Sequence, residues 1–121
     1  MELKEIANKL VSKFRNGQSI ETLSELYDTD AISVEAIDHG NGREAMGIEA
    51  IREKHQWWDA NVEVKEESVS DAMLHGDNKF AVIFKVYGRF LESGEEFHME
   101  EIAVYYINSG KIVREEFFLS P

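Results

Sequence analysis

The sequence contains no cysteine, and its single proline is the last residue. Without cysteine the chain can form no disulfide, no thiolate metal site and no cysteine nucleophile. No run of 18 apolar residues occurs, and the start of the chain lacks a basic segment followed by an apolar run. A membrane-spanning helix and a secretory signal are therefore not predicted, and we expect a cytoplasmic protein.

Basic residues are scarce relative to acidic ones. The chain has 13 Lys and Arg against 24 Asp and Glu, a formal net charge of −11 over 121 residues. Such a charge repels phosphate backbones and anionic lipid surfaces. We therefore expect neither a nucleic-acid nor a membrane partner. The hydrophobic share of 43% is that of a globular protein, and the length fits one domain over residues 1–121.

Apolar residues at helical spacing predict three helices. Gly17 marks the end of the first helix, Ser19 is expected to cap the second, and the third is predicted to begin near Gly47 and to stop near Asn61. The apolar positions are Leu3, Ile6, Ala7, Leu10, Val11 and Phe14 in the first helix, Ile20, Leu23 and Leu26 in the second, and Ile48, Ile51, His55 and Trp58 in the third.

The rest of the chain predicts β-strands. "AISVEAI" and "EAM" read as a hairpin across a glycine-rich loop. Four longer strands follow, at about residues 62–75, 79–90, 95–107 and 111–119, separated by the turn sequences "HGDN", "ESGE" and "NSGK". The predicted order is two helices, a hairpin, a third helix and an antiparallel meander. This order predicts an α+β fold with the helices on one face of a curved sheet.

Three stretches of the sequence resemble a known family: "FRNGQSIETLSELYDTDAISVEA", "GIEAIREKHQWW" and "MEEIAVYYINSGKIVREEFF". They are similar to the SnoaL-like branch of the nuclear transport factor 2-like superfamily, which also contains ketosteroid isomerase. The resemblance implies a cone in which a curved antiparallel sheet wraps around three helices and leaves an apolar pocket at its open end. It also implies that the chain dimerises through the outer face of the sheet.

The same resemblance argues against ketosteroid isomerase chemistry. The general base of that enzyme would fall at Ala36, and its two hydrogen-bond donors would fall at Leu10 and Ile102. None of these side chains can carry a proton or donate a hydrogen bond, whereas the isomerase reaction needs a base and donors at the developing enolate. Steroid isomerisation is therefore not expected.

The strand at about 95–107 carries a glutamate in an apolar row. With a period of two, Glu101 shares a face with Phe97, Met99, Ala103 and Tyr105. If this face points inward, burial raises the pKa of Glu101, and the carboxyl needs a partner. The proposed partners are His55 and Tyr105. The alternative interpretation is an acid at the rim of the cone, paired with Arg114 of the adjacent strand.

We select two candidate catalytic residues, Glu101 and His55. His55 is either a proton shuttle or a partly buried histidine without a chemical role. Glu35 either faces Glu101 across the cone or is a solvated strand acid. The side chains expected to bind a ligand are Tyr105, Trp58, Glu35, Met99, Phe84 and Arg114.

No motif of the sequence predicts a metal or another cofactor, because the histidines lack ligand spacing and the glycines form no phosphate-binding loop. Three functions stay open: acid–base chemistry on a small hydrophobic ligand, ligand binding without catalysis, and a dimeric interaction module. The face opposite the predicted pocket carries Ala81, Ile83, Tyr87, Ile102, Val104 and Tyr106. Because the helices can cover only one face, we expect a second copy of the chain to cover this one.

Overall fold

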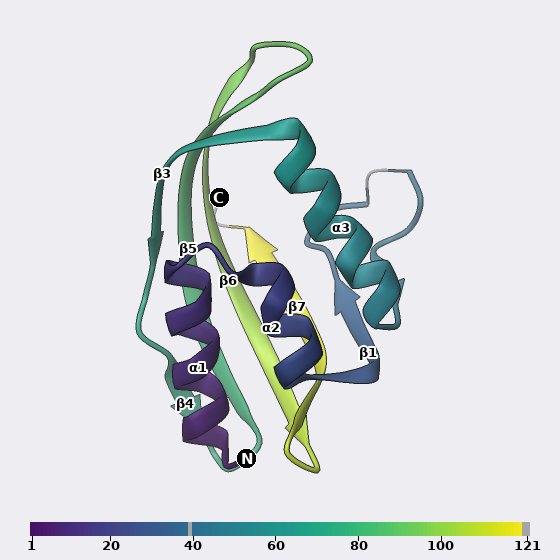
Figure 1. The fold of residues 1–121 in the computed structure, drawn as a ribbon, viewed down its shortest axis with the longest axis vertical. Coiled ribbons are helices and arrows are strands. Elements are labelled where there is room, and N and C mark those ends of the chain that lie inside the picture. Colours follow the sequence, from purple (N-terminus) through teal and green to yellow (C-terminus); the bar gives the residue numbers. More distant parts are fainter. Residues whose placement is uncertain (39, 120–121) are drawn as a thin grey trace.

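A computed structural model describes residues 1–38 and 40–119 of the chain. Three helices lie on one face of a curved sheet, as Figure 1 shows. The elements are α1 (Leu3–Arg15), α2 (Ser19–Leu26), β1 (Tyr27–Val34), β2 (Glu44–Met46), α3 (Ile48–Asn61), β3 (Val62–Val69), β4 (Met73–His75), β5 (Lys79–Phe90), β6 (Glu96–Asn108) and β7 (Lys111–Leu119). The predicted α+β class and the three helices are confirmed.

The sheet is mixed rather than wholly antiparallel. Its strand order is β2-β1-β7-β6-β5-β3, and β4 pairs with β5. Strand β1 runs parallel to β7, whereas every other pair is antiparallel. The parallel pair arises because the chain crosses the whole sheet between β1 and β7. The prediction of a purely antiparallel sheet is therefore corrected. The parallel pairing also places residues 32–34 of β1 beside residues 114–116 of β7.

The turn after α1 has the form that the sequence predicts. Gly17 adopts φ +70°, a left-handed conformation that glycine reaches without a steric penalty. The N–H of Gly17 donates to Phe14 O, and the N–H of Gln18 donates to Lys13 O at 2.8 Å. These two bonds form a Schellman motif. Gln18 then takes the N-cap position of α2, so Ser19 is the first helical residue and the predicted Ser19 cap is wrong.

The predicted strand over residues 62–75 is interrupted. The backbone N–H of Ile83 donates to the side-chain hydroxyl of Ser70 at 2.8 Å. The backbone N–H of Ser70 in turn donates to the carbonyl oxygen of Ile83. Because the hydroxyl takes the place of a backbone acceptor, the regular ladder stops at Val69 and pairing resumes at Met73. The edge of the sheet is therefore made of two short strands, β3 and β4.

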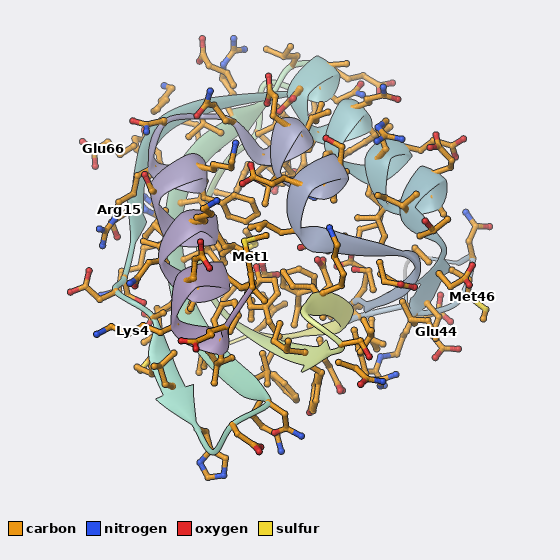
Figure 2. The ribbon with its side chains drawn as sticks, turned by 60° about the horizontal axis from the view of Figure 1, so that its bottom comes forward. Met1, Lys4, Arg15, Glu44, Met46 and Glu66 are labelled. Carbon is orange, nitrogen blue, oxygen red and sulfur yellow. The ribbon has the colours of Figure 1, made fainter. Side chains whose placement is uncertain are left out.

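The core lies between the helices and the inner face of β5, β6 and β7. Ile6, Leu10 and Leu23 of the helices and Phe80 and Tyr105 of the sheet are almost completely buried. The stick view in Figure 2 shows side chains filling the space between helices and sheet. None of the described helices is long and apolar enough to cross a bilayer. Among the described residues, three buried side chains other than tyrosines are polar, and two of them, Ser33 and Glu115, form the site described next.

Candidate active site

Glu115 is the most deeply buried acid of the described chain. It lies in β7 with 2% of its surface exposed, and it pairs with Ser33 of the parallel strand β1. Ser33 Oγ donates to one carboxylate oxygen at 2.9 Å, and the Tyr27 hydroxyl donates to the other in a very short bond. Burial raises the pKa of Glu115, while the charge of Lys54 and the two hydroxyl donors oppose that rise. The carboxyl is thus buried but fully provided with donors.

Lys54 of α3 connects this buried acid to a second acid, Glu35. Its ammonium donates to Ser33 Oγ at 2.6 Å and forms a short ion pair with Glu35, which follows β1. The ammonium also lies 5.2 Å from the centre of the Phe117 ring, within cation–π range. Lys54 therefore lies between two acids, Glu35 directly and Glu115 through Ser33.

Glu101 faces the same interior from β6, as the period-two pattern predicts. It lies directly opposite Phe84 of β5 and is partly buried. Its pKa is raised to about 7, first by burial and then by the charge of Glu35, while Lys54 lowers it and Glu115 raises it. No hydrogen bond or ion pair joins the Glu101 carboxyl to another group within residues 1–38 and 40–119. A carboxyl with a pKa near neutrality can both accept and donate a proton at physiological pH.

Tyr105 lies four residues beyond Glu101 on the same face of β6, with Ala103 between them, and is completely buried. Its ring stacks on Phe80 with 4.9 Å between centroids. Its hydroxyl is the one buried side-chain polar atom without a hydrogen-bond partner in the described part of the chain. Burial and then the charge of Glu115 raise the pKa of Tyr105 well above its usual range, while the nearby Tyr27 hydroxyl opposes the rise, so the Tyr105 hydroxyl keeps its proton. An unpaired hydroxyl of this kind is uncommon in a protein interior.

The other predicted pocket residues form an apolar wall near Glu101. Phe84 packs on Phe14 of α1 with 5.5 Å between ring centroids, and Trp58 of α3 packs edge-on against Phe97 at 5.8 Å. Met99 is partly buried on the same face of β6. The structure thus places Phe84, Trp58 and Met99 on the inner side, as predicted.

His55 lies on the inner side of α3, but the predicted hydrogen bond between His55 and Glu101 is not found among the described residues. Its ring meets the edge of Phe14 at 6.4 Å, and no hydrogen bond from its side chain is found among the described residues. Burial lowers its pKa below the ordinary value, and the charge of Lys54 adds to this effect. His55 is therefore neutral at pH 7 and packs as an aromatic side chain.

The alternative interpretation, an ion pair between Glu101 and Arg114, is wrong. Arg114 lies opposite Tyr106 on the outer face and pairs with Glu116 at 3.3 Å. The reason is a β-bulge, since the pairing of β6 with β7 shifts register between Tyr106 and Ile107. One extra residue in a strand reverses the faces of all residues beyond it. The bulge turns Glu115 inward and Arg114 outward.

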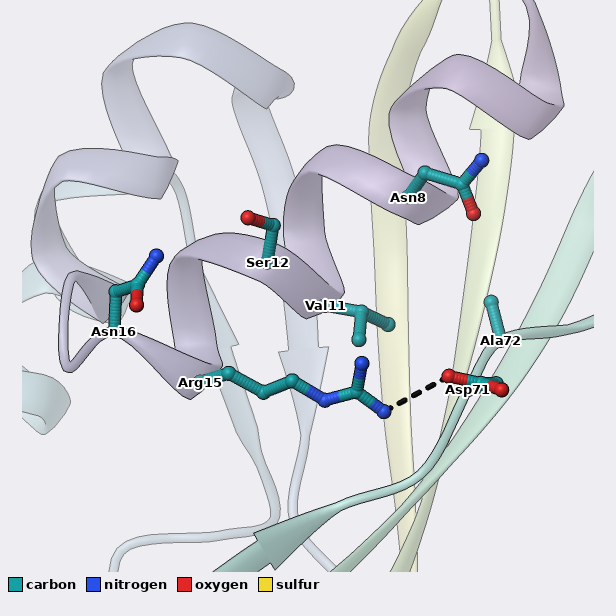
Figure 3. Close-up of a pocket in the computed structure, with 7 residues that line it drawn as sticks. All are labelled: Asn8, Val11, Ser12, Arg15, Asn16, Asp71 and Ala72. Atoms are coloured by element: carbon teal, nitrogen blue, oxygen red, sulfur yellow. Dashed lines mark hydrogen bonds and ion pairs between the residues drawn. The ribbon is translucent and has the colours of Figure 1, made fainter.

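The described residues include no group of three His, Asp or Glu side chains placed to hold a metal ion. Two open hollows of about 590 Å³ each are present elsewhere. One lies along α1, where Arg15 pairs with Asp71 at 2.9 Å (Figure 3). The other lies over β3, β5 and β6, and Met99 is among the residues that line it.

The three helices and the curved mixed sheet form an α+β fold of the nuclear transport factor 2-like type. The family model of the SnoaL-like domain matches residues 1–119. The chain belongs to this family of SnoaL-like domains.

Solved structures agree with this assignment. A protein from Mesorhizobium loti, provisionally assigned as a SnoaL-like polyketide cyclase, is 32% identical over 98% of this chain and 99% of its own, with a TM-score of 0.90. A provisionally assigned isomerase from Bacillus subtilis is 20% identical over 100% of this chain and 91% of its own, with a TM-score of 0.81. At that identity the likeness shows the fold alone. No curated protein matches the chain in the sequence comparison.

Proposed function

We propose that the chain is an enzyme that moves a proton on a small, largely apolar molecule bound at the open end of the cone. Glu101 is the group that accepts and donates this proton. The observation that carries the proposal is the unpaired carboxyl of Glu101, held on the inner face beside the Lys54–Glu35 ion pair and opposite the apolar ring of Phe84. The provisional assignments of the similar proteins as a cyclase and an isomerase support this class of reaction.

The remaining interior residues have supporting roles in this proposal. Lys54 and Ser33 hold Glu115 in place, because they supply its cation and one of its donors. Phe84, Trp58 and Met99 provide the apolar wall against which the ligand packs. His55 contributes packing rather than proton transfer, since burial keeps its imidazole neutral.

The experiment starts with a thermal-shift screen of a metabolite library on the protein. Each stabilising compound is then incubated with the enzyme in D₂O, and ¹H NMR records deuterium uptake at its carbon positions. We expect uptake with the wild type and with Glu100→Gln, the outward-facing neighbour, but not with Glu101→Gln. Uptake by Glu101→Gln at the wild-type rate would show that another group moves the proton.

We also propose that two copies of the chain associate through the outer face of the sheet. Several large apolar side chains on this face are exposed in the single chain, and Met46 of β2 points away from the body of the molecule (Figure 2). The exposed fractions are 39% for Ile102, 45% for Phe118, 46% for Met73 and 68% for Met46. An apolar patch of this kind is typical of a protein–protein interface.

Light scattering after gel filtration tests the association at micromolar concentration. We expect a dimer for the wild type and a monomer for Ile102→Lys, which places a charge in the patch. Leu91→Lys is the matched control, because Leu91 is also exposed, at 48%, but lies in the turn after β5. A wild-type monomer would refute this assembly.

A further inference from the structure

The interior site contains more negative than positive charge. Three glutamates lie close enough to affect one another's pKa: Glu35, Glu101 and Glu115. Within the described residues, Lys54 is the one cation that lowers the pKa of Glu101 or Glu115. The ammonium of Lys54 is already engaged, because it pairs with Glu35, donates to Ser33 and lies over the Phe117 ring. When Glu101 is ionised, the site therefore lacks a positive charge that could balance it.

Tyr105 gives a second, independent indication of a missing partner. Its hydroxyl is completely buried on the face that carries Glu101, and it has no hydrogen-bond partner in the described structure. A phenol oxygen can accept a hydrogen bond as well as donate one. A buried polar group without a partner costs free energy that a ligand with a matching donor would recover. The free acceptors here are a carboxylate and a phenol oxygen.

Aromatic rings lie on the same inner face of the sheet and on the helices that cover it. Phe84 lies directly opposite Glu101, Phe14 packs on Phe84, and Trp58 packs against Phe97. Aromatic faces attract organic cations and also pack well against an apolar body. The net charge of −11 adds a long-range attraction for cations in general.

We infer that the ligand of this site is a primary or secondary amine in its ammonium form, carried on an apolar body. The ammonium donates hydrogen bonds to the Glu101 carboxylate and to the Tyr105 oxygen, and the aromatic side chains pack on the body. This inference rests on the proposed function in one respect, the location of the ligand on the inner face. It concerns binding and is independent of the reaction that follows.

Three probes of the same shape separate charge from apolar packing: cyclohexylmethylamine, cyclohexylmethanol and cyclohexanecarboxylate. Their binding to the full chain is measured by calorimetry and NMR at pH 8, where Glu101 is ionised and the amine is still protonated. The variants are Glu101→Gln and Tyr105→Phe. Glu100→Gln removes the same charge from the outer face and is the matched control.

We expect the wild type to bind the amine at least about tenfold more tightly than the alcohol, since a hydrogen bond to a charged group contributes on that scale. Glu101→Gln should abolish most of this preference and Tyr105→Phe should reduce it. Glu100→Gln should preserve it.

Two results would overturn the inference. One is equal or tighter binding of the alcohol or the carboxylate at the inner face of the wild type, which would leave the proposed proton transfer by Glu101 intact. The other is the absence of amine binding up to the solubility of the probe. A third combination of results separates the two proposals. If amine binding depends on Glu101 but no deuterium uptake is detected, the proposed reaction is refuted and the proposed ligand class is retained.

Discussion

Glu115 and Glu101 are two glutamates on the inner face of neighbouring strands, and they differ in how deeply they are buried and in how many hydrogen-bond donors surround them. Glu115 is the more deeply buried, yet Tyr27 and Ser33 donate to its carboxylate and Lys54 lies behind Ser33. Glu101 is less deeply buried and has no bonded partner among the described residues. The comparison shows that depth alone does not determine whether an interior acid is left without partners. The supply of hydrogen-bond donors differs between the two positions.

The strongest test of this contrast is Glu115→Ala. The change leaves the Tyr27 hydroxyl, Ser33 and Lys54 without their shared acceptor, and breaking a buried charged network typically costs about 3–5 kcal/mol. We expect urea unfolding at pH 7 to show a loss of this size. Glu116→Ala, the neighbour on the outer face, should cost less than about 1 kcal/mol, because its pairs with Arg43 and Arg114 are partly exposed. Equal losses for the two variants would contradict the contrast.

Glu101 should instead make stability decrease as the pH rises. The pKa of Glu101 is about 7 in the folded protein against an ordinary value of 4.5, so between these pH values the folded state binds more protons than the unfolded state. The contribution of Glu101 to stability is therefore complete below about pH 4.5 and is lost as the pH rises through about 7. The difference between a pKa of 4.5 and one of about 7 corresponds to about 3 kcal/mol of stability.

Glu101→Gln removes this dependence. We expect the variant to be more stable than the wild type at pH 8 and to approach it near pH 4.5. Urea unfolding of both proteins across this range measures the difference. A variant that is less stable at pH 8 would mean that Glu101 has a cationic partner in solution.

Lys54→Met tests the link between the two acids. The loss of the ammonium should raise the pKa of Glu101 further above about 7, because Lys54 is the group that lowers it. It should also cost about 1–3 kcal/mol at pH 7, since Glu35 and Ser33 lose a charged donor. The ¹³C shift of the Glu101 carboxyl reports its titration. Lys65→Met is the control, because Lys65 pairs with Glu96 at the surface, and it should leave the Glu101 titration unchanged.

The smallest effects separate the two tyrosines. Tyr105→Phe removes a hydroxyl that has no partner, so its stability should stay within about 1 kcal/mol of the wild type. Tyr27→Phe takes a donor from Glu115 and should cost about 1–2 kcal/mol. Thermal or urea unfolding at pH 7 compares the pair. A larger loss for Tyr105→Phe would indicate that its hydroxyl is bonded in solution.

The period-two pattern of β6 was sufficient to predict the orientation of Glu101, because that part of the strand pairs with β5 without a shift of register. The same reasoning failed on β7. The bulge near Ile107 places Ile112 and Glu115, three residues apart, on one face, and a strict alternation assigns them to opposite faces. A bulge of this kind depends on how two distant strands pair and leaves no local signal in the sequence.

Ser33 and Lys54 were missed for a related reason. Ser33 meets Glu115 through the parallel β1–β7 pair, and a series of strands joined by tight turns predicts only antiparallel neighbours. Lys54 is one of several charged residues on α3, and its inward direction follows from the position of that helix over β1. The order of the helices and strands, by contrast, depends on local patterns and could be predicted.

The parallel pairing of β1 with β7 also determines when the interior can form. The Ser33–Glu115 and Tyr27–Glu115 bonds join residues 82 and 88 positions apart. Contacts over such separations form slowly, because a long loop must close before they contribute. We therefore expect Glu115 to reach Ser33 and Tyr27 only after β7 has docked on β1. If β7 detaches from the sheet, Tyr27 and Ser33 lose their contacts with Glu115. We therefore expect local opening at β7 to break the interior network while the β5–β6 hairpin stays paired.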